Sequence, residues 1–267
     1  MIPEAILFDL DDTILSDDVV SEEAWKEACD RFAEKVKVRG SEELFDRINA
    51  VRMTFWSNPM NLREGTRNLY KSRLTIVKTA LRELGIENEA FARQIVTLYQ
   101  DAKWGLLRLY PNAEETIMAL KRKGIKLALL TNGEAESQRA KVEKFALARH
   151  FPVCLIEGEI GYGKPDPRVF QMALDRLQAR PQGTWMVGDR LEFDIAGAQS
   201  LGIFAIWSDY TSQGTASEFG NSPQRNHPRY FGVADPGREK RTVLSKAQSP
   251  KVRASESLSA FRYGFDF

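Results

Sequence analysis

The chain has 267 residues, of which 43% are hydrophobic, enough for one large α/β domain with a smaller inserted one. Lysine and arginine number 38 and aspartate and glutamate 37, so the net charge of +1 gives no indication of a nucleic acid or a membrane surface as partner. With two cysteines, two histidines and no run of about 18 apolar residues, the sequence argues against zinc, iron–sulfur and membrane-spanning classes. We expect a cytoplasmic protein whose Cys29 and Cys154 stay reduced, and the composition leaves its oligomeric state open.

The first predicted element is a buried parallel strand, ILF at residues 6–8, which ends in Asp9-Leu10-Asp11-Asp12-Thr13. Open α/β sheets carry their chemistry at the carboxyl ends of such strands, and alternation turns Asp9 and Asp11 to the same side. Two neighbouring carboxylates repel each other, and one pKa rises unless a cation neutralises them. The pair suits one carboxylate attacking while the other moves a proton. On this motif alone, helix capping or turn chemistry explains the two residues equally well.

A long helical stretch follows the first strand. Apolar residues recur at helical spacing in four successive segments, which we predict as helices at residues 21–36, 42–56, 66–84 and 89–105. A crossover between parallel strands usually needs only one helix. Residues 16–105 are therefore predicted to form an inserted helical bundle.

From residue 110 onward, predicted strands and helices alternate. The strands are expected at 125–130, 153–156, 184–187 and 203–207. A helix is expected before each of them, at 112–123, 135–145, 168–177 and 195–201. This alternation predicts an α/β fold with a doubly wound parallel sheet and right-handed crossovers. We assign residues 1–15 and 106–207 to this catalytic core.

The last segment, residues 208–267, has a different composition. It holds only about five Ile, Leu or Val residues among many Ser, Gly, Pro and Arg residues, too few to offset its conformational entropy by burial. We predict a poorly ordered or atypical tail. A docking motif built from its last four aromatic residues, binding of an acidic partner or RNA, and a shifted reading frame remain alternatives.

Further polar residues follow other predicted strands or lie in adjoining loops. Thr131 and Asn132 offer a hydroxyl and an amide beside a glycine, which fits phosphate oxygens as well as an ordinary turn. Lys164, in a Gly-flanked loop, could neutralise a phosphoryl group, although a lysine is usually solvated. Asp189 could bind a divalent ion such as Mg²⁺ together with the carboxylate at the first strand. Asp194 either supports Lys164 or caps the helix that follows it.

Four segments occur in order, each at a predicted strand end or its adjoining loop: DLDDT, LLTNG, GKPDPRVF and VGDRLEFDIAGA. Together they resemble the four motifs of the haloacid dehalogenase (HAD) superfamily of phosphohydrolases, over about residues 4–207. The insertion at 16–105 looks like the C1-type helical cap of that superfamily. The motif forms are most similar to the branch of N-acylneuraminate-9-phosphatases and house-cleaning nucleotidases. Family members usually continue with a further strand and helix after the segment 203–207, and this sequence has none there.

The resemblance implies a catalytic pair and a cofactor. Asp9 would be the nucleophile that forms an aspartyl-phosphate, and Asp11 would be the general acid for the leaving group and then the base for water. Mg²⁺ would be held by Asp9, the main-chain carbonyl of Asp11, and Asp189. The implied reaction is hydrolysis of a small phosphorylated metabolite, a sugar phosphate or a nucleoside monophosphate.

The same resemblance implies a phosphate site. Thr131 and Lys164 would bind the phosphoryl group, Asn132 would assist, and Asp194 would support the site from behind. These roles agree with the independent argument that phosphoryl transfer depends on positioning and charge neutralisation.

Other activities on the same fold remain open. A 2-haloacid dehalogenase also uses an aspartate nucleophile, but it needs no leaving-group acid, so Asp11 argues against it. A phosphomutase would use the same pair of aspartates, and a catalytically silent module would bind a partner through its tail. Substrate choice is expected to lie in the cap, where helical spacing predicts that most aromatic residues are core rather than pocket. The candidates for lining a pocket are Trp25, Phe55, Trp56, Arg63, Tyr70 and Trp104.

Overall fold

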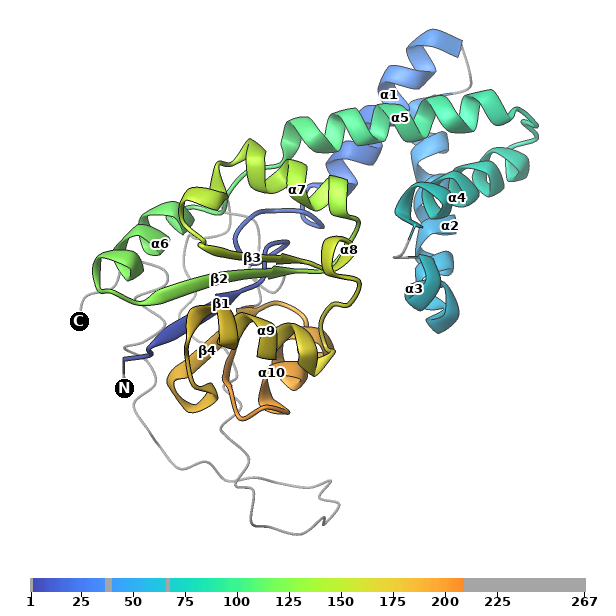
Figure 1. Ribbon diagram of the computed structural model, residues 1–267. Helices are drawn as coiled ribbons and strands as arrows, with labels where there is room; N and C mark the ends of the chain where they lie inside the picture. Colours follow the sequence, from blue (N-terminus) through green and yellow to red (C-terminus); the bar gives the residue numbers. More distant parts are fainter. Residues whose placement is uncertain (1, 37–39, 66–67, 209–267) are drawn as a thin grey trace, which may run out of the picture. The chain divides into compact units, whose positions relative to one another are not determined.

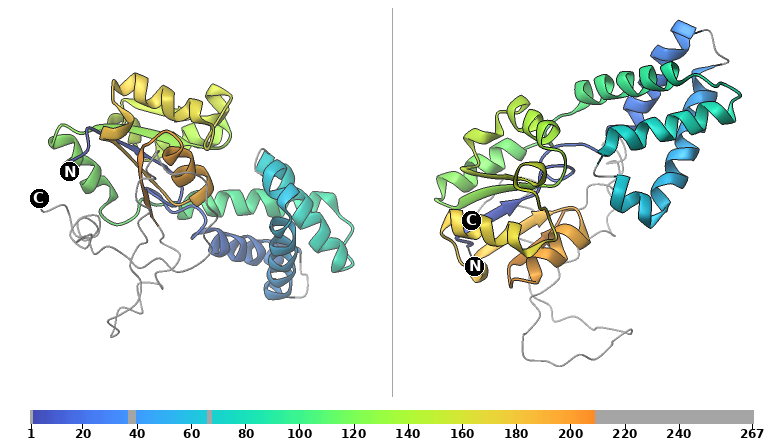
Figure 2. Two further views of the ribbon diagram at one scale, coloured as in Figure 1. Left: turned by 90° about the horizontal axis from the view of Figure 1, so that it is seen from below. Right: turned by 45° about the vertical axis from the view of Figure 1, so that its right-hand side comes forward.

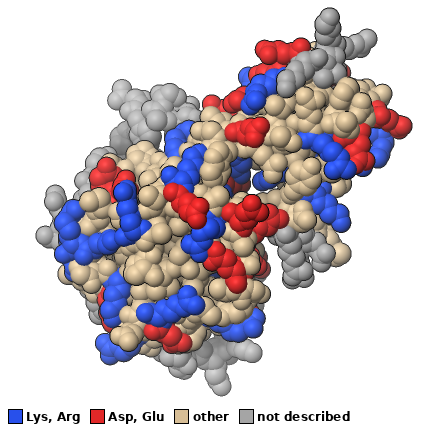
Figure 3. All heavy atoms as spheres, turned by 45° about the horizontal axis from the view of Figure 1, so that its top comes forward, with Lys and Arg blue, Asp and Glu red and all other residues tan. Residues whose placement is uncertain are grey.

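The computed structural model describes residues 2–36, 40–65 and 68–208, and the predicted tail lies outside them apart from Ser208. The chain divides into two compact units. The first comprises Met1–Ile14, Leu109–Asn132 and Arg139–Phe267, and the second comprises Leu15–Arg108 and Gly133–Gln138. Lys and Arg side chains are interspersed with Asp and Glu on the face that Figure 3 shows, as the net charge of +1 indicates.

The first unit is built around a five-stranded parallel sheet with the order β3-β2-β1-β4-β5 (Figure 1). The strands are β1 (Ala5–Phe8), β2 (Lys126–Thr131), β3 (Val153–Ile156), β4 (Thr184–Gly188) and β5 (Phe204–Trp207). All four residues of β1 are buried because this strand lies at the centre of the sheet. The predicted doubly wound parallel sheet is confirmed.

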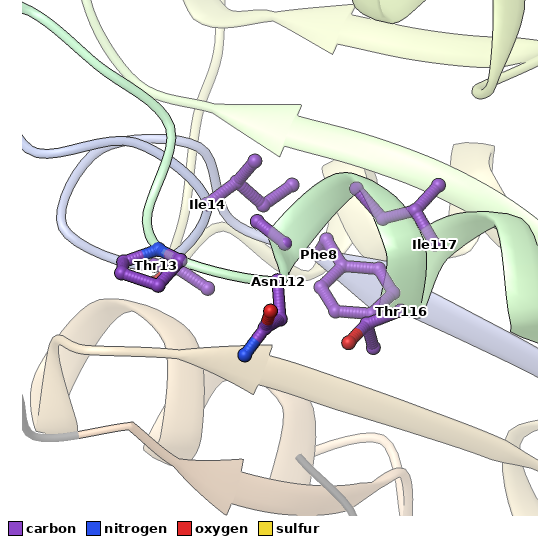
Figure 4. A pocket seen from close by; sticks show the side chains of 8 residues that line it. Phe8, Thr13, Ile14, Asn112, Thr116 and Ile117 are labelled. Carbon is purple, nitrogen blue, oxygen red and sulfur yellow. The ribbon is translucent and has the colours of Figure 1, made fainter. Parts of the chain in front are cut away.

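Helices cover both faces of this sheet, and the alternation of β1 shows how. Ala5 and Leu7 belong to the apolar cluster that also holds Val169 and Phe170 of α9 (Pro167–Leu177). Phe8 points to the other face, where it lines a cavity with residues of α6 (Ala113–Arg122) (Figure 4). The strand is therefore apolar on both faces, which explains why it reads as a continuous hydrophobic run.

The cavity beside Phe8 is too small for a substrate. Its volume of about 10 Å³ matches a single water molecule. Its lining includes Phe8, Thr13, Ile14, Asn112, Thr116 and Ile117 (Figure 4). A substrate site must therefore lie elsewhere in this unit, and the ends of the strands are the place that the fold favours.

Some elements differ from the sequence prediction. The helix expected from 195 begins earlier, as a π-helical segment at Leu191–Ala196 followed by α10 (Gly197–Gln199). Asp194 lies inside this segment, so the alternative that it caps a helix starting at the next residue is wrong. Asn112 takes a left-handed conformation with φ of 63° and its side chain makes no capping hydrogen bond to α6. The remaining helices of this part of the chain are α7 (Ala135–Lys144) and the short α8 (Glu157–Ile160), the second of which was not predicted.

The second unit is the predicted bundle of helices. Its helices are α1 (Ser21–Val36), α2 (Ser41–Ser57), α3 (Pro59–Gly65), α4 (Leu69–Glu83) and α5 (Glu89–Leu106). Helices α1 and α5 pack along each other (Figures 1 and 2). Figure 2 also shows α2 and α4 side by side. The short helix α3 was not predicted, because Pro59 reads equally well as the end of one helix and the start of the next.

The aromatic residues of this bundle divide into core and surface. Trp25 is 2% exposed and stacks on Tyr99 with ring centroids 3.9 Å apart. Phe55 and Trp56 are partly buried against the same core, whereas Tyr70 and Trp104 are 37% and 41% exposed. The side chain of Arg63 lies outside the described residues. Within the described residues, none of the helices combines the length and apolar character that crossing a membrane requires.

Candidate active site

The site is built on strands whose ends lie level with one another. In the register of the sheet, Phe8 at the end of β1 lies opposite Leu129 of β2 and Val187 of β4. The chain therefore leaves all three strands at one edge of the sheet. Asp9 continues this alignment for one residue, because its N–H donates to the carbonyl of Val187 at 2.9 Å. Polar residues that follow these strands are brought together by the sheet itself.

Lys164 lies between two of the predicted carboxylates. Its Nζ is 2.5 Å from Asp9 Oδ1, to which it donates a hydrogen bond, and 2.6 Å from Asp194 Oδ1. The side chain of Lys164 is 3% exposed and that of Asp194 is fully buried. The contact with Asp194 is a second buried ion pair, so Lys164 lies against both carboxylates. Asp194 thus lies beside Lys164, and its supporting role in the reaction stays a prediction.

Asn132 holds the main chain of Lys164 in place. Its Nδ2 donates to the Lys164 carbonyl at 2.7 Å, and the Lys164 N–H donates to Asn132 Oδ1 at 2.8 Å. Gly163 is needed beside this clamp, since a Cβ there would lie 2.5 Å from Asn132 Oδ1. Asn132 thus fixes the lysine by its backbone, a role that the sequence did not reveal. Its assistance in binding phosphate stays a prediction.

Burial and charge shift the titration of these groups. Burial raises the pKa of Asp9 well above its ordinary value, and the nearby charges of Asp194 and Asp189 add to the rise while Lys164 opposes it. Burial, with the charges of Asp194 and Asp12, raises the pKa of Asp189 to about 7. For Lys164, burial lowers the pKa, but the two carboxylates outweigh it and leave the pKa above its ordinary value. The site therefore has an excess of negative charge that one lysine does not offset.

Three carboxylates could share a cation. Oxygen atoms of Asp9, Asp189 and Asp194 all lie within 4.8 Å of one another. A buried set of carboxylates fits a hard divalent ion, because such ions prefer oxygen ligands. The loop that carries them is fixed: Trp207 Nε1 donates to the Asp189 carbonyl at 2.8 Å, and the Arg190 N–H donates to Asp194 Oδ2 at 2.9 Å. The residues present therefore fit a bound divalent metal ion.

Asp11 lies apart from this cluster and has a partner of its own. Lys141 of α7 places its Nζ 2.8 Å from both carboxylate oxygens of Asp11. Lys141 is 8% exposed, and the side chain of Asp11 is 28% exposed. Lys141 was not among the site residues predicted from the sequence. One indication in the sequence that Lys141 faces inward is its place beside Val142, an apolar residue that is buried in α7.

Thr131 is the last residue of β2, and it is 3% exposed.

Among the predicted residues, the structure brings together Asp9, Lys164, Asp189 and Asp194. It leaves the side chain of Asp11 at the edge of the site. Asp12, for which no chemical role was predicted, is buried with φ of 56°, a left-handed turn directly after Asp11.

Comparison with known proteins shows the family of this chain. A model of the haloacid dehalogenase-like hydrolase family matches residues 3–202. The phosphoserine phosphatase of Thermus thermophilus is 33% identical over 223 residues, which cover 76% of this chain and 88% of that protein. The N-acylneuraminate-9-phosphatase of Rattus norvegicus is 28% identical over 221 residues, covering 76% and 81%. The likeness to this second enzyme agrees with the branch suggested by the motif forms.

Among solved structures, the magnesium-bound HAD hydrolase YfnB from Bacillus subtilis superposes with a TM-score of 0.60 over 82% of this chain and 92% of its own. At 22% identity, this likeness shows the fold alone. The family match spans strands β1 to β4, the helical insertion and every predicted site residue. This chain belongs to the haloacid dehalogenase-like hydrolases.

Proposed function

We propose that this hydrolase is a Mg²⁺-dependent phosphatase that acts on small phosphate monoesters through an aspartyl-phosphate on Asp9. The observation that carries the proposal is the buried contact of Lys164 with Asp9 and Asp194, beside the carboxylate of Asp189. A phosphoryl group brought to Asp9 would meet a fixed positive charge there. The relatives support the reaction type, because several are named as phosphatases of small phosphorylated compounds.

In the first step, a carboxylate oxygen of Asp9 attacks phosphorus. The bond from phosphorus to the ester oxygen breaks, and Asp11 gives a proton to that oxygen as it leaves. Lys164 and Thr131 hold the phosphoryl oxygens in line. Asp9, Asp189 and the main-chain carbonyl of Asp11 would hold a divalent ion, with Asp194 close by, and its positive charge would keep Asp9 ionised and offset the negative charge of the phosphoryl group.

In the second step, Asp11 acts as a base. It takes a proton from water, which attacks the phosphorus of the aspartyl-phosphate. The bond from phosphorus to the Asp9 oxygen breaks, inorganic phosphate is released, and both aspartates return to their starting state. Asp194 stays ionised beside Lys164 throughout and keeps that lysine charged.

Two alternatives use the same nucleophile and differ at Asp11. A dehalogenase releases a halide, which needs no proton, so the presence of Asp11 favours an oxygen leaving group. A phosphomutase would use both aspartates but would return the phosphoryl group to a substrate hydroxyl. A catalytically silent module that binds a partner through residues 208–267 is the non-enzymatic alternative, and that tail lies almost wholly outside the described residues.

Turnover of p-nitrophenyl phosphate tests the proposal. We expect the wild type to release p-nitrophenol when Mg²⁺ is added and to lose this activity with EDTA. Asp9→Asn should lower kcat by about a thousandfold or more, because the nucleophile is gone. Asp175→Asn is the matched control, since Asp175 lies on α9 and pairs with Gln171. Equal, negligible rates for the wild type and Asp9→Asn would refute the proposed phosphatase activity.

Labelled water and a substrate panel define the reaction further. During turnover in H₂¹⁸O, attack of water on phosphorus puts the label into phosphate, whereas hydrolysis of a carbon ester on Asp9, as in a dehalogenase, puts it into the Asp9 carboxylate. A panel of sugar phosphates and nucleoside monophosphates should show broad activity with KM values in the millimolar range. A single substrate with a micromolar KM would contradict this breadth.

A cytoplasmic location is also proposed, on the state of the two cysteines. Cys29 and Cys154 are both free thiols. Burial raises the pKa of Cys29 to about 12 and also raises that of Cys154. Both thiols therefore stay protonated near neutral pH, as expected of cysteines that pack rather than react.

A further inference from the structure

A second lysine contacts the catalytic pair, and nothing in the proposed reaction has used it. Lys141 Nζ lies 2.8 Å from Asp11 Oδ1 and 2.8 Å from Asp11 Oδ2. This arrangement is symmetrical, with one ammonium group against both oxygens of one carboxylate. Lys141 itself is 8% exposed although lysine is rarely buried without a partner.

Lys164 and Lys141 contact different carboxylates. Lys164 contacts Asp9 and Asp194, on the side where the phosphoryl group and the cation are expected. Lys141 contacts Asp11, whose side chain remains 28% exposed. The division matches the two tasks of the reaction, since one lysine lies at the nucleophile and the other at the carboxylate that moves protons.

The position of Asp11 depends on such a contact. Asp11 lies three residues beyond Phe8, the last residue of β1, and its side chain projects from the segment that follows the strand. Lys141 is anchored on α7 beside the buried Val142. A bidentate contact from a helix restricts the rotation of the carboxylate, and a proton donor must be within hydrogen-bond reach of the leaving oxygen.

We propose that Lys141 is a positioning residue that holds the Asp11 carboxylate in place for proton transfer to the leaving group and from water. This inference rests on the proposed phosphatase reaction. In this role Lys141 acts through Asp11, the carboxylate that it contacts. Its removal therefore weakens proton transfer while leaving the attack by Asp9 intact.

The dependence of rate on the leaving group separates these two effects. When the bond to the ester oxygen breaks, the electron pair stays on that oxygen, and a strongly basic oxygen needs the Asp11 proton while a weakly basic one does not. We compare phenyl phosphate, p-nitrophenyl phosphate and 2,4-dinitrophenyl phosphate, whose leaving groups become less basic in that order. The measured quantity is kcat/KM, which reports the transfer of the phosphoryl group to Asp9.

The variants are Lys141→Met, Lys141→Arg and the control Lys144→Met, which removes a lysine from an exposed position on the same helix. We expect Lys141→Met to lower kcat/KM about 30-fold for phenyl phosphate and less than about threefold for 2,4-dinitrophenyl phosphate. Lys141→Arg should restore most of the loss, because a guanidinium also binds a carboxylate at two points. Lys144→Met should match the wild type on all three substrates.

A double variant tests whether Lys141 acts through Asp11. In the Asp11→Asn background, Lys141→Met should change kcat/KM for phenyl phosphate less than about twofold. The reason is that the side chain at position 11 can then no longer donate a proton to the leaving group. Losses that multiply, or a loss equal for all three substrates, would mean that Lys141 contacts the substrate or only stabilises the fold, and either result overturns the proposal. Thermal unfolding of Lys141→Arg and Lys141→Met identifies the second case.

The outcomes also separate this inference from the proposed function. A wild type that hydrolyses none of the three esters overturns the phosphatase and with it this role. An active wild type with an unchanged Lys141→Met variant overturns the positioning role alone. A loss confined to basic leaving groups and absent in the Asp11→Asn background supports both.

Discussion

Lys164 Nζ and Asp9 Oδ1 lie 2.5 Å apart, and both side chains are more than nine-tenths buried. A buried ion pair loses much solvation, so its charges persist only where each has close partners. Here Asp194 is a second partner of the lysine. The pair therefore places a permanent positive charge beside the nucleophile, and several measurements depend on it.

Removing the lysine should destabilise the fold as well as stop the reaction. Lys164→Met leaves the carboxylates of Asp9 and Asp194 buried without their cation, and we expect the free energy of unfolding to fall by about 3 kcal/mol or more. Urea denaturation measures this change. The exposed pair Arg47 and Glu83 is the control, and Arg47→Met should cost less than about 1 kcal/mol. Similar losses of unfolding free energy in the two variants would show that the buried pair of Lys164 and Asp9 contributes no more than an exposed one.

Binding of Mg²⁺ should weaken in acid. The pKa of Asp189 is raised to about 7, so below that pH the carboxyl carries a proton that a cation must displace. We expect the Kd for Mg²⁺ to rise about tenfold for each pH unit below about 7 and to change little above it. Isothermal titration between pH 6 and pH 8 checks this. A Kd that is constant over the range would show that Asp189 does not take part.

The same shift predicts how the metal-free protein responds to pH. Because the folded pKa of Asp189 lies above the ordinary value of 3.8, the folded chain binds more protons than the unfolded chain between pH 3.8 and about 7. The raised pKa of Asp9 acts in the same direction. The stability from these groups is complete below pH 3.8 and is lost as the pH rises through about 7. Adding Mg²⁺ at pH 8 should therefore raise the Tm more than adding it at pH 6.

Gly188 should not tolerate a side chain. A Cβ at this position would lie 2.3 Å from Asp194 Cγ, so Gly188→Ala must displace the carboxylate that pairs with Lys164. We expect a loss of about 2 kcal/mol in the free energy of unfolding, together with a lower kcat. Gly105 is the control, because a Cβ there meets nothing within 4 Å and alanine favours the helix. Wild-type kcat in Gly188→Ala would contradict the tight packing.

The sequence predicted the parts of the site that the sheet itself aligns. Asp9, Thr131 and Asp189 follow buried strands, and parallel strands end at a common edge, so their proximity could be inferred from strand ends alone. Lys164 was found from its loop motif, and it lies in contact with Asp194.

The remaining features depend on packing that periodicity does not encode. Lys141 meets Asp11 only because α7 is rotated to turn that side chain inward, and the rotation of a helix is set by tertiary contacts. The pairing of Asn132 with the Lys164 backbone joins residues that are 32 positions apart. The early start of the helix at Leu191 reflects a π-helical turn, for which the sequence has no simple signal.

That turn also limits how the chain can vary in length. Gly188 packs against Asp194, and Asp194 accepts a hydrogen bond from the Arg190 N–H, so the segment closes on itself as a small ring. Deleting one residue inside it would rotate Asp194 around the helix axis and take its carboxylate away from Lys164. The exposed side chains of Leu191 and Glu192 can be replaced by others. The number of residues between Gly188 and Asp194 cannot change, and neither can the glycine or the aspartate.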